Sequence, residues 1–431
     1  MVALRPVRAW HPGLSDSGAD PLVCPVYDTL SDAEVERFAA ANPYNAAGFV
    51  PRPRSLGLEA FLDRAQRNLT AALAAGAYVR DAAPAYYVYG IQHVPPPDIA
   101  EALEPEQRRP EYLLLGLVGA LDVDRLAHGQ VALHERTFPV RVAERVALTD
   151  VTGMTFAPIL AGYHAADHRL NDRLEQPLGI HRRGLAFQGR RAPVVSANVG
   201  ATSHRLWRID DPAEVAELRA LVDPLRLLIL DGHHRFTAAA RRTYEGRPTA
   251  PLVMVVDGAD RALLLLPWHR VIPSDVIDPG RLTDAARTQF SSVQEAPEAR
   301  TIEGAIARLR TMRTAGRRGF LLVTSEGANE FDGPASDDAG ADFDVLHEFL
   351  NEVLEIDGER VLYVRSPRAA LEGVSARGPD GSRSAILLPG LSARGVEARA
   401  FDRAQVMAEK STMFLPKVAE GMLFAPAGRD E

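Results

Sequence analysis

Five consecutive residues, Asp231, Gly232, His233, His234 and Arg235, combine the side chains that phosphate chemistry uses. Four apolar residues precede them and a segment of helical character follows, so we expect them where a strand meets a helix. Backbone N–H groups and the positive end of a helix dipole point at one spot there, which favours an anion. Gly232 lets the backbone approach a phosphate, Arg235 can bind two of its oxygens, and the histidines add donors.

Asp231 would face the same crevice, where its carboxylate could hold Mg²⁺ or orient a hydroxyl group. In the competing interpretation, Asp231 only caps the helix and the two histidines pack or are solvated. Local spacing alone leaves both interpretations open.

A second carboxylate, Glu135, follows an apolar approach and precedes a helix predicted over Val140–Asp150. The apolar sequence "APIL" comes after that helix. This order suggests that Glu135 lies at the rim of a sheet, although a single His-Glu pair says little about function.

Trp268, His269 and Arg270 emerge after an apolar run, so they could contact the carboxylate or phosphate of a substrate. The alternative is a packed tryptophan beside a solvated pair.

Near the C-terminus, Lys410, Ser411, Thr412 and Lys417 offer two amines and two hydroxyls around Phe414 and Pro416. A cationic loop that closes over an anionic ligand is one interpretation of this segment. An ordinary surface turn is the other.

The bulk properties exclude several classes of function. With a net charge of −8, the chain has no basic field for a nucleic-acid backbone, so we expect no nucleic-acid partner. No run of residues is apolar over the length of a membrane span, and Cys24 is the only cysteine, so we expect no membrane association and a cytoplasmic location. Oligomeric state has no signature in the sequence.

The elements predicted from periodicity give a mixed α/β fold. A helix is expected over Asp32–Ala41, with Ser31 and Glu34 forming a capping box, and two strands over 85–94 and 111–123 are expected to pair. The two apolar runs within 250–272, separated by "DGAD", are expected to form a hairpin. At 431 residues we expect several subdomains, divided as 1–125, 126–275 and 276–431.

The order of these motifs resembles the ParB/sulfiredoxin-like fold: His-Glu, a helix, Pro-Ile-Leu, and later a strand that ends in Asp-Gly-His-His-Arg. Its phosphate box, Gly-x-x-Arg-x-x-Ala, matches Gly232, Arg235 and Ala238. Within that superfamily the chain is most similar to nucleotide-dependent free-serine kinases. The pieces "RPVRAW", "HRLWRIDDP", "LPWHRVI" and "KSTMFLPKVAEGMLF" resemble a conserved, uncharacterised family over nearly the full length.

The resemblance implies an embedded nucleotide-binding module and a kinase that phosphorylates a hydroxyl group, with free L-serine as the leading substrate. Glu135 would take or position the proton of the attacking hydroxyl, and Asp231 would assist through Mg²⁺ or a hydrogen bond. ATP or ADP would be the phosphoryl donor, with its phosphates held by residues 232–235. Trp268 departs from the small or polar residue expected at its position, and the segment between "APIL" and "DGHHR" is longer than in the compact serine kinases.

Two other classes of function compete with the kinase. The first is a nucleotide-binding switch, a slow NTPase that acts through a protein partner. The second is metal-dependent hydrolysis. Reduction of sulfinic acids is disfavoured because the phosphate loop carries no cysteine, and DNA segregation is disfavoured by the acidic composition.

Overall fold

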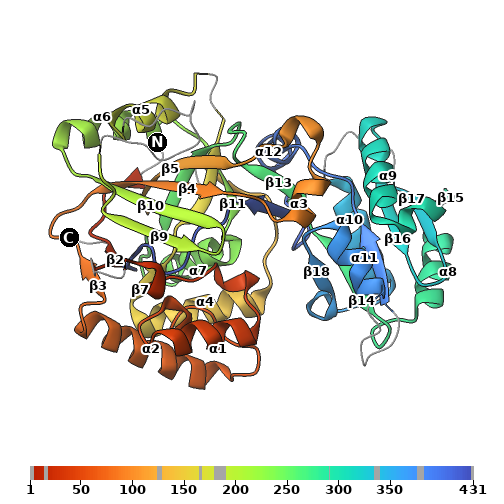
Figure 1. Ribbon diagram of the computed structural model, residues 1–431, viewed down its shortest axis with the longest axis horizontal. Coiled ribbons are helices and arrows are strands. Elements are labelled where there is room, and N and C mark those ends of the chain that lie inside the picture. The colour runs from red at the N-terminus through yellow and green to blue at the C-terminus, as the bar shows by residue number, and fades with distance from the viewer. Residues whose placement is uncertain are drawn as a thin grey trace.

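The computed structural model describes residues 4–13, 18–123, 129–164, 167–178, 191–290, 292–333, 340–375 and 383–428. Strands and helices are interspersed along the described chain, which confirms the expected mixed α/β fold. A large sheet occupies one side of the molecule, and a second sheet with its own helices occupies the other (Figure 1). The expected boundary between residues 125 and 126 lies outside the described residues.

The larger sheet has nine strands and contains the strand that leads to the Asp-Gly-His-His-Arg turn. In spatial order it consists of β6 (Val131–Leu133), β11 (Leu227–Asp231), β8 (Ile159–Tyr163), β12 (Leu252–Asp257), β5 (Tyr112–Leu121), β4 (Tyr86–His93), β10 (Thr202–Ile209) and β9 (Val195–Val199), with β1 (Leu4–Arg5) also paired to β5. β11 runs parallel to β6 and antiparallel to β8. All ten residues of β5 are buried, as expected for a central strand covered on both faces.

Several elements agree with the sequence patterns. β4 and β5 pair in antiparallel register, which confirms the expected strand pair. Helix α1 (Asp32–Ala41) begins at the predicted capping box, in which Glu34 N–H donates to the Ser31 hydroxyl and the Ser31 N–H donates to the Glu34 carboxylate. The predicted helix after Glu135 is α4 (Pro139–Thr152).

The prediction of a hairpin within residues 250–272 is wrong, because the two apolar runs do not pair with each other. β12 pairs with β5 on one edge and with β8 on the other, so no edge remains for the apolar run that follows it. That run, β13 (Leu264–Pro267), pairs instead with β20 (Thr412–Leu415). A turn sequence between two apolar runs predicts a reversal of the chain, but the partner of each strand depends on which sheet edge is available.

The second sheet has six strands and is covered by helices (Figure 1). Its spatial order is β15 (Val293–Glu295), β17 (Ala328–Asp332), β16 (Gly319–Val323), β19 (Arg383–Leu387), β14 (His269–Pro273) and β18 (Leu362–Val364). The helices of this half are α8 (Pro279–Gln289), α9 (Ile302–Thr314), α10 (Ala341–Glu348) and α11 (Pro367–Ser375). The remaining helices are α2 (Leu58–Ala74), α3 (Pro97–Ala102), α5 (Arg169–Leu178), α6 (Pro212–Val222), α7 (His233–Tyr244) and α12 (Ala393–Phe401).

After α12 the chain returns from the second half to the first. β20 pairs with β13, and β21 (Phe424–Pro426) joins a four-stranded sheet with β7 (Met154–Phe156), β2 (Trp10–Pro12) and β3 (Tyr78–Arg80). The segment around β20 thereby comes to lie beside the end of β6, where Met407 and Glu135 form a parallel bridge.

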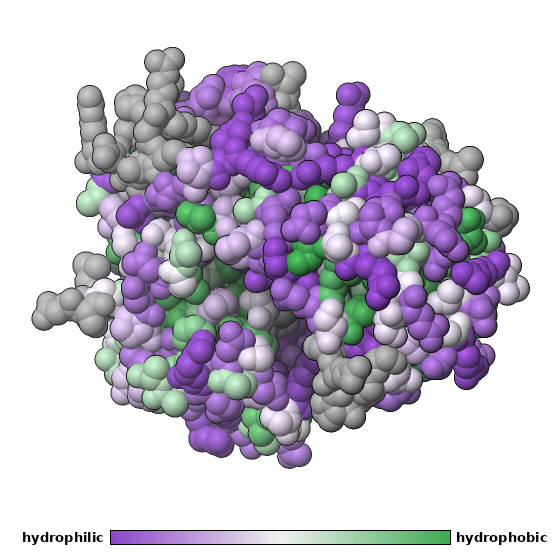
Figure 2. Space-filling model, turned by 45° about the vertical axis from the view of Figure 1, so that its right-hand side comes forward, coloured by the Kyte–Doolittle hydropathy of each residue, from purple (hydrophilic) through white to green (hydrophobic). Residues whose placement is uncertain are grey.

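The surface in Figure 2 mixes hydrophilic and hydrophobic residues and is hollowed near the centre of that view. Among the described helices, none combines the length and apolar character that crossing a bilayer requires.

Candidate functional site

Ten of the thirteen candidate residues line one pocket, which we call the Glu135 pocket. It is open to solvent and has an empty volume of about 530 Å³. Its candidate residues are Glu135, Asp231, Gly232, His233, His234, Arg235, Trp268, Lys410, Thr412 and Lys417, and it is completed by Val26, Tyr27, Arg136 and Leu230. The pocket therefore combines the ends of β6 and β11, the start of α7 and the chain around β20.

The strand-to-helix turn forms as the sequence predicts. β11 ends at Asp231, and α7 begins at His233 with Gly232 as its N-cap. Gly232 has a φ of 90°, a backbone conformation that glycine adopts far more readily than other residues. A Cβ atom at this position would lie 2.8 Å from a guanidinium nitrogen of Arg235. The backbone of the turn therefore favours glycine, and any larger residue would also displace the Arg235 guanidinium.

Protein groups already hold most of the Arg235 guanidinium. Nη1 donates to the carbonyl of Ala157 at 2.8 Å and to that of Pro158 at 3.3 Å, and Nη2 donates to Asp231 at 3.3 Å. Nε is buried and has no hydrogen-bond partner among the described residues. A buried N–H without an acceptor costs about 1–3 kcal/mol. A ligand oxygen at Nε would remove that cost.

The Asp231 carboxylate lies between two cations. Oδ1 accepts from Lys417 Nζ, and Oδ2 accepts from Arg235. Mg²⁺ in proteins is usually held by one or two carboxylates together with waters and substrate phosphates. Among the described residues no group of three or more His, Cys, Asp or Glu side chains could hold a metal ion, and both oxygens of Asp231 are occupied. The side chains as they stand do not fit a resident Mg²⁺.

Glu135 is bound by Thr412 and lies next to His134. Its Oε2 accepts from the Thr412 N–H at 2.7 Å and is 2.6 Å from the Thr412 hydroxyl. Burial raises the pKa of the Glu135 carboxyl, while the hydrogen bonds from Thr412 and the charges of Lys410 and Lys417 oppose that rise. Glu135 is thus a shielded carboxyl group whose proton affinity is higher than usual.

The two histidines of the turn have different surroundings. His233 is buried, and its Nε2 lies 3.3 Å from His134 Nδ1. Burial and the neighbouring histidines hold the pKa of His233 well below its usual value. His234 stacks on Phe138 with an interplanar angle of 9°, and its Nε2 accepts from the Phe138 N–H at 3.1 Å. At neutral pH, His233 is therefore an uncharged ring.

Trp268 and Lys410 lie at the pocket wall, where the Lys410 ammonium is 5.2 Å from the centre of the indole ring. Such a cation–π contact fixes the position of the amine without neutralising its charge. The adjacent Ser411 is buried, and its hydroxyl donates to the carbonyl of Ala408, so this side chain holds the loop together.

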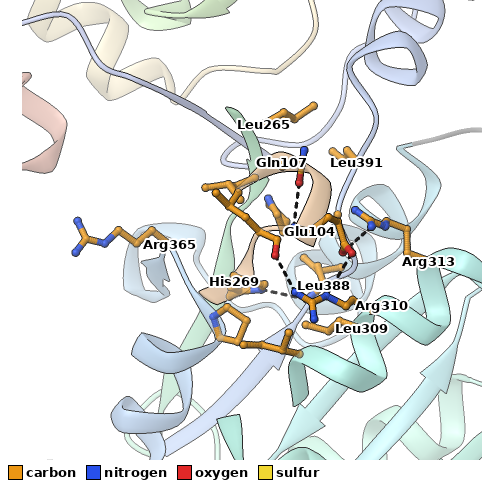
Figure 3. A pocket seen from close by; sticks show the side chains of 17 residues that line it. Glu104, Gln107, Leu265, His269, Leu309, Arg310, Arg313, Arg365, Leu388 and Leu391 are labelled. Atoms are coloured by element: carbon orange, nitrogen blue, oxygen red, sulfur yellow. Dashed lines mark hydrogen bonds and ion pairs between the residues drawn. The ribbon is translucent and has the colours of Figure 1, made fainter. Parts of the chain in front are cut away.

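His269 and Arg270 do not line the Glu135 pocket. His269 borders another pocket, in which Glu104 interacts with Arg310 and Arg313 (Figure 3). Burial lowers the pKa of His269 to about 3, and its Nδ1 accepts from the Leu388 N–H.

The buried Arg270 donates to the carbonyl of Trp268 and lies over the rings of Phe343 and Tyr363. Both His269 and Arg270 belong to β14, an interior strand of the second sheet, whose first four residues are buried.

A second, larger cavity adjoins the Glu135 pocket and shares Tyr27, His234 and Lys410 with it. Its empty volume is about 840 Å³. The other residues that line it are Leu30, Asp32, Arg52, Arg54, Phe138, Arg141, Glu144, Gly358, Glu359, Val361 and Tyr363. Together the two cavities give a ligand room to extend from the turn toward aromatic and charged side chains.

Sequence analysis did not assign a role in the site to Tyr27, Arg136 or His134. Tyr27 and Arg136 line the pocket, but nothing in the spacing of the sequence places residue 27 near residue 231. His134 is buried beside Glu135. Its place directly before Glu135 in the sequence was the one local pattern that could have indicated a role in the site.

The fold and the pocket define a mixed α/β protein with a ligand-sized cavity at a strand-to-helix turn. Residues 4–334 match the family described as protein of unknown function (DUF1015), and the chain belongs to that family. The expected membership of an uncharacterised family is thereby confirmed for residues 4–334, rather than over nearly the full length. Lys410, Thr412 and Lys417 lie beyond the matched residues, although they line the same pocket.

Comparison with curated proteins finds a partial match to 1-deoxy-D-xylulose-5-phosphate synthase of Arthrobacter sp. (strain FB24), 34% identical over 98 residues. The matched part covers 22% of this chain and 15% of that enzyme's length.

Among solved structures, the chain is loosely similar to a mutant free serine kinase in complex with ADP, with 13% identity, a TM-score of 0.40, and coverage of 69% of this chain and 87% of that one. A conserved hypothetical protein from Pyrococcus furiosus is 12% identical with a TM-score of 0.38, over 70% of this chain and 94% of that one. SbnI with a C-terminal truncation, from Staphylococcus aureus, is 13% identical with a TM-score of 0.34, over 69% of this chain and 82% of that one.

Proposed function

We propose that the protein is a nucleotide-dependent kinase that transfers a phosphoryl group to the hydroxyl of a small polar metabolite, with free L-serine as the leading candidate. One observation carries this proposal: the carboxyl of Glu135 and the turn at residues 231–235 line the same pocket, together with Lys410 and Lys417. The resemblance of this turn to the phosphate box of the ParB/sulfiredoxin-like proteins also supports it.

The phosphates of ATP or ADP would bind at the start of α7, where the positive end of the helix dipole favours negative charge. Arg235 would add its Nε, and Lys410 and Lys417 would neutralise the phosphate oxygens. Phosphoryl transfer is catalysed mainly by positioning and charge neutralisation, so these groups match its main requirement. Glu135 would orient the acceptor hydroxyl and take its proton.

The adjoining cavity would hold the nucleoside or part of the acceptor. Its aromatic residues Phe138 and Tyr363 offer surfaces for stacking. Mg²⁺ would enter with the nucleotide, because phosphate oxygens and water can supply most of its ligands, and we assign it no resident site.

The net charge of −8 and the buried Cys24 support a cytoplasmic enzyme that acts on small molecules and has no nucleic-acid or membrane partner.

The test is to incubate the purified protein with Mg²⁺, a panel of nucleoside di- and triphosphates and a panel of small alcohols that includes L-serine. Phosphorus NMR would then detect any new phosphomonoester. We expect one with a single alcohol, and we expect Glu135→Gln to abolish it while nucleotide affinity changes little. Glu245→Gln, at the C-terminal end of α7, is the matched control and should leave the rate unchanged.

Nucleotide binding without a new ester across the whole panel would contradict the kinase. It would favour the nucleotide-binding switch that acts through a protein partner. In that case Glu135→Gln would leave the biological output nearly intact, because no proton transfer to Glu135 would be needed.

A further inference from the structure

The cavity that adjoins the Glu135 pocket contains more positive than negative side chains. Among the described residues that line it, four carry a positive charge and three carry a carboxylate. The cations are Arg52, Arg54, Arg141 and Lys410, and the carboxylates are Asp32, Glu144 and Glu359. An excess of positive charge favours an anionic ligand, provided that protein groups already bind the carboxylates.

Protein donors occupy two of these three carboxylates. Each oxygen of Asp32 accepts from a backbone N–H of residues 54–55, at 2.8 and 2.9 Å. Glu144 is buried, its Oε1 accepts from Arg145, and its Oε2 accepts from Arg52 Nε at 2.6 Å. Burial alone would raise the pKa of Glu144, but the two arginines hold it below its usual value. Asp32 and Glu144 therefore present no unoccupied oxygen that would repel an anion.

The same contacts leave donors of two guanidinium groups for a ligand. Arg52 is held through Nε by Glu144 and through Nη1 by the carbonyl of Leu56 at 2.8 Å. Its Nη2 has no partner in the part of the chain that the structure describes. Arg141 makes one long hydrogen bond, from Nη2 to Glu359 at 3.5 Å, and its Nη1 lies 3.9 Å from Glu144. Both arginines thus have N–H groups that a ligand in the cavity can reach.

A nucleoside matches this cavity less well than an anion does. It is uncharged at neutral pH, so it would cover two guanidinium groups without neutralising them. The aromatic surfaces are also partly used, because Phe138 stacks on His234 at an interplanar angle of 9°. The central guanidinium carbon of Arg270 lies 5.6 Å from the centre of the Tyr363 ring. An oxyanion, in contrast, accepts two parallel hydrogen bonds from a guanidinium group.

We propose that this cavity binds a carboxylate of the acceptor, with Arg52 and Arg141 as specificity-determining residues. The inference rests on the proposed kinase function, and it assigns the cavity to the acceptor and not to the nucleoside. A carboxylate carries one negative charge, which matches the excess charge of the cavity, whereas a phosphate monoester carries about 1.5 to 2. Because the two cavities share three lining residues, one acceptor can place its hydroxyl at Glu135 and its carboxylate at the two arginines.

Arg141→Gln is the first test, because this side chain has few contacts with the rest of the protein. We expect the KM for a carboxylate acceptor to rise about 10- to 100-fold, the usual effect of losing a hydrogen bond to a charged group, with kcat and nucleotide affinity little changed. Arg360→Gln is the matched control. Arg360 follows Glu359 in the chain, pairs with Asp275 and does not line the cavity, so its loss should leave the KM unchanged.

Arg52→Lys is the second variant. Lysine keeps a positive charge beside the buried Glu144 but offers no second nitrogen to a ligand. We expect the KM to rise to a similar extent, and calorimetric titration with ATP should give an unchanged nucleotide affinity. A fall in kcat at constant KM in both variants would overturn the proposal, because the arginines would then act on the transfer step and not on acceptor binding.

Ligand-observed NMR tests the cavity without any turnover. The probes are L-lactate, L-serine and 4-hydroxybutyrate, in which the hydroxyl and the carboxylate are increasingly far apart, each compared with its carboxamide. The carboxamide keeps the hydroxyl but lacks the negative charge. We expect at least one acid to bind more tightly than its amide, and we expect Arg141→Gln, but not Arg360→Gln, to remove that difference.

The two kinds of experiment can fail separately. If an acid is preferred over its amide in this way but no ester forms, the carboxylate site holds and the proposed kinase fails. If acid and amide bind equally, or no acid binds, the carboxylate site is wrong even where an alcohol is phosphorylated. Tighter binding of glycerol 3-phosphate than of every acid would also overturn it, and would indicate an acceptor that is already phosphorylated.

Discussion

At the scale of single residues, Gly232 connects backbone conformation to the position of Arg235. We expect Gly232→Ala to lower the free energy of unfolding by about 1–2 kcal/mol, because alanine is strained at a φ of 90°. It should also weaken nucleotide binding, since the new Cβ displaces the Arg235 guanidinium. Urea denaturation and calorimetric titration with ATP would measure the two effects.

Gly246→Ala is the matched control for this prediction. Gly246 follows the other end of α7 with a φ of 81°, and a Cβ there would meet no atom within 4 Å. It should show a similar loss of stability with unchanged nucleotide affinity. Equal affinity losses in both variants would mean that strain in α7, and not the position of Arg235, controls binding.

Sequence patterns were informative for residues that are close together in the chain and poor for those that are far apart. The turn at 231–235 could be predicted because it depends on one strand, one glycine and one helix start. The pairing of Lys417 with Asp231 depends on a chain return over 186 positions, and no local pattern encodes it. The same return gives Glu135 its partner Thr412.

At the scale of elements, the capping box of α1 gives a prediction that is independent of the site. Ser31→Ala removes the acceptor for the Glu34 N–H, so we expect a loss of about 1 kcal/mol in the free energy of unfolding. Thr70→Ala, at an exposed position within α2, should be neutral or slightly stabilising because alanine favours helix. Equal effects of the two variants would contradict the cap as the source of stability.

The capping box could be predicted because both partners lie within one turn of helix. The strand partners of the two apolar runs within 250–272 could not be predicted in this way. Apolar runs such as β12 and β13 identify strands, but each has two edges, and distant strands compete for them. β5 and β8 occupy both edges of β12. For the same reason β20, which supplies Thr412, had no predictable partner.

At the scale of the whole molecule, buried neutral histidines make stability depend on pH. Burial lowers the pKa of His93 and His134 to about 4 and that of His204 and His269 to about 3. In the unfolded chain these groups bind protons below about pH 6.5, whereas the folded protein binds them only below about pH 4. Stability is therefore fully present above about pH 6.5 and is lost as the pH falls.

We expect the free energy of unfolding to fall between pH 7 and pH 5, by roughly 1 kcal/mol per pH unit for each such histidine once the unfolded form titrates. Urea denaturation at both pH values would measure it. The raised pKa of Glu135 acts in the opposite direction, since it favours the folded state at low pH. His204→Gln should make the dependence shallower, and an unchanged slope would show that His204 is not a source of it.

The return of the chain through β20 also bears on how the protein is made. A ribosome that has translated the chain only as far as Phe401 has already released the strand–turn–helix of residues 227–244, but Thr412 and Lys417 do not yet exist. Because domains generally fold as synthesis proceeds, the large sheet can form early with Asp231 and Glu135 still lacking those partners. The pocket is therefore completed only after β20 and Lys417 have been synthesised, and a product that stops before β20 would carry the turn at residues 231–235 without the Thr412 and Lys417 side chains that line the same pocket.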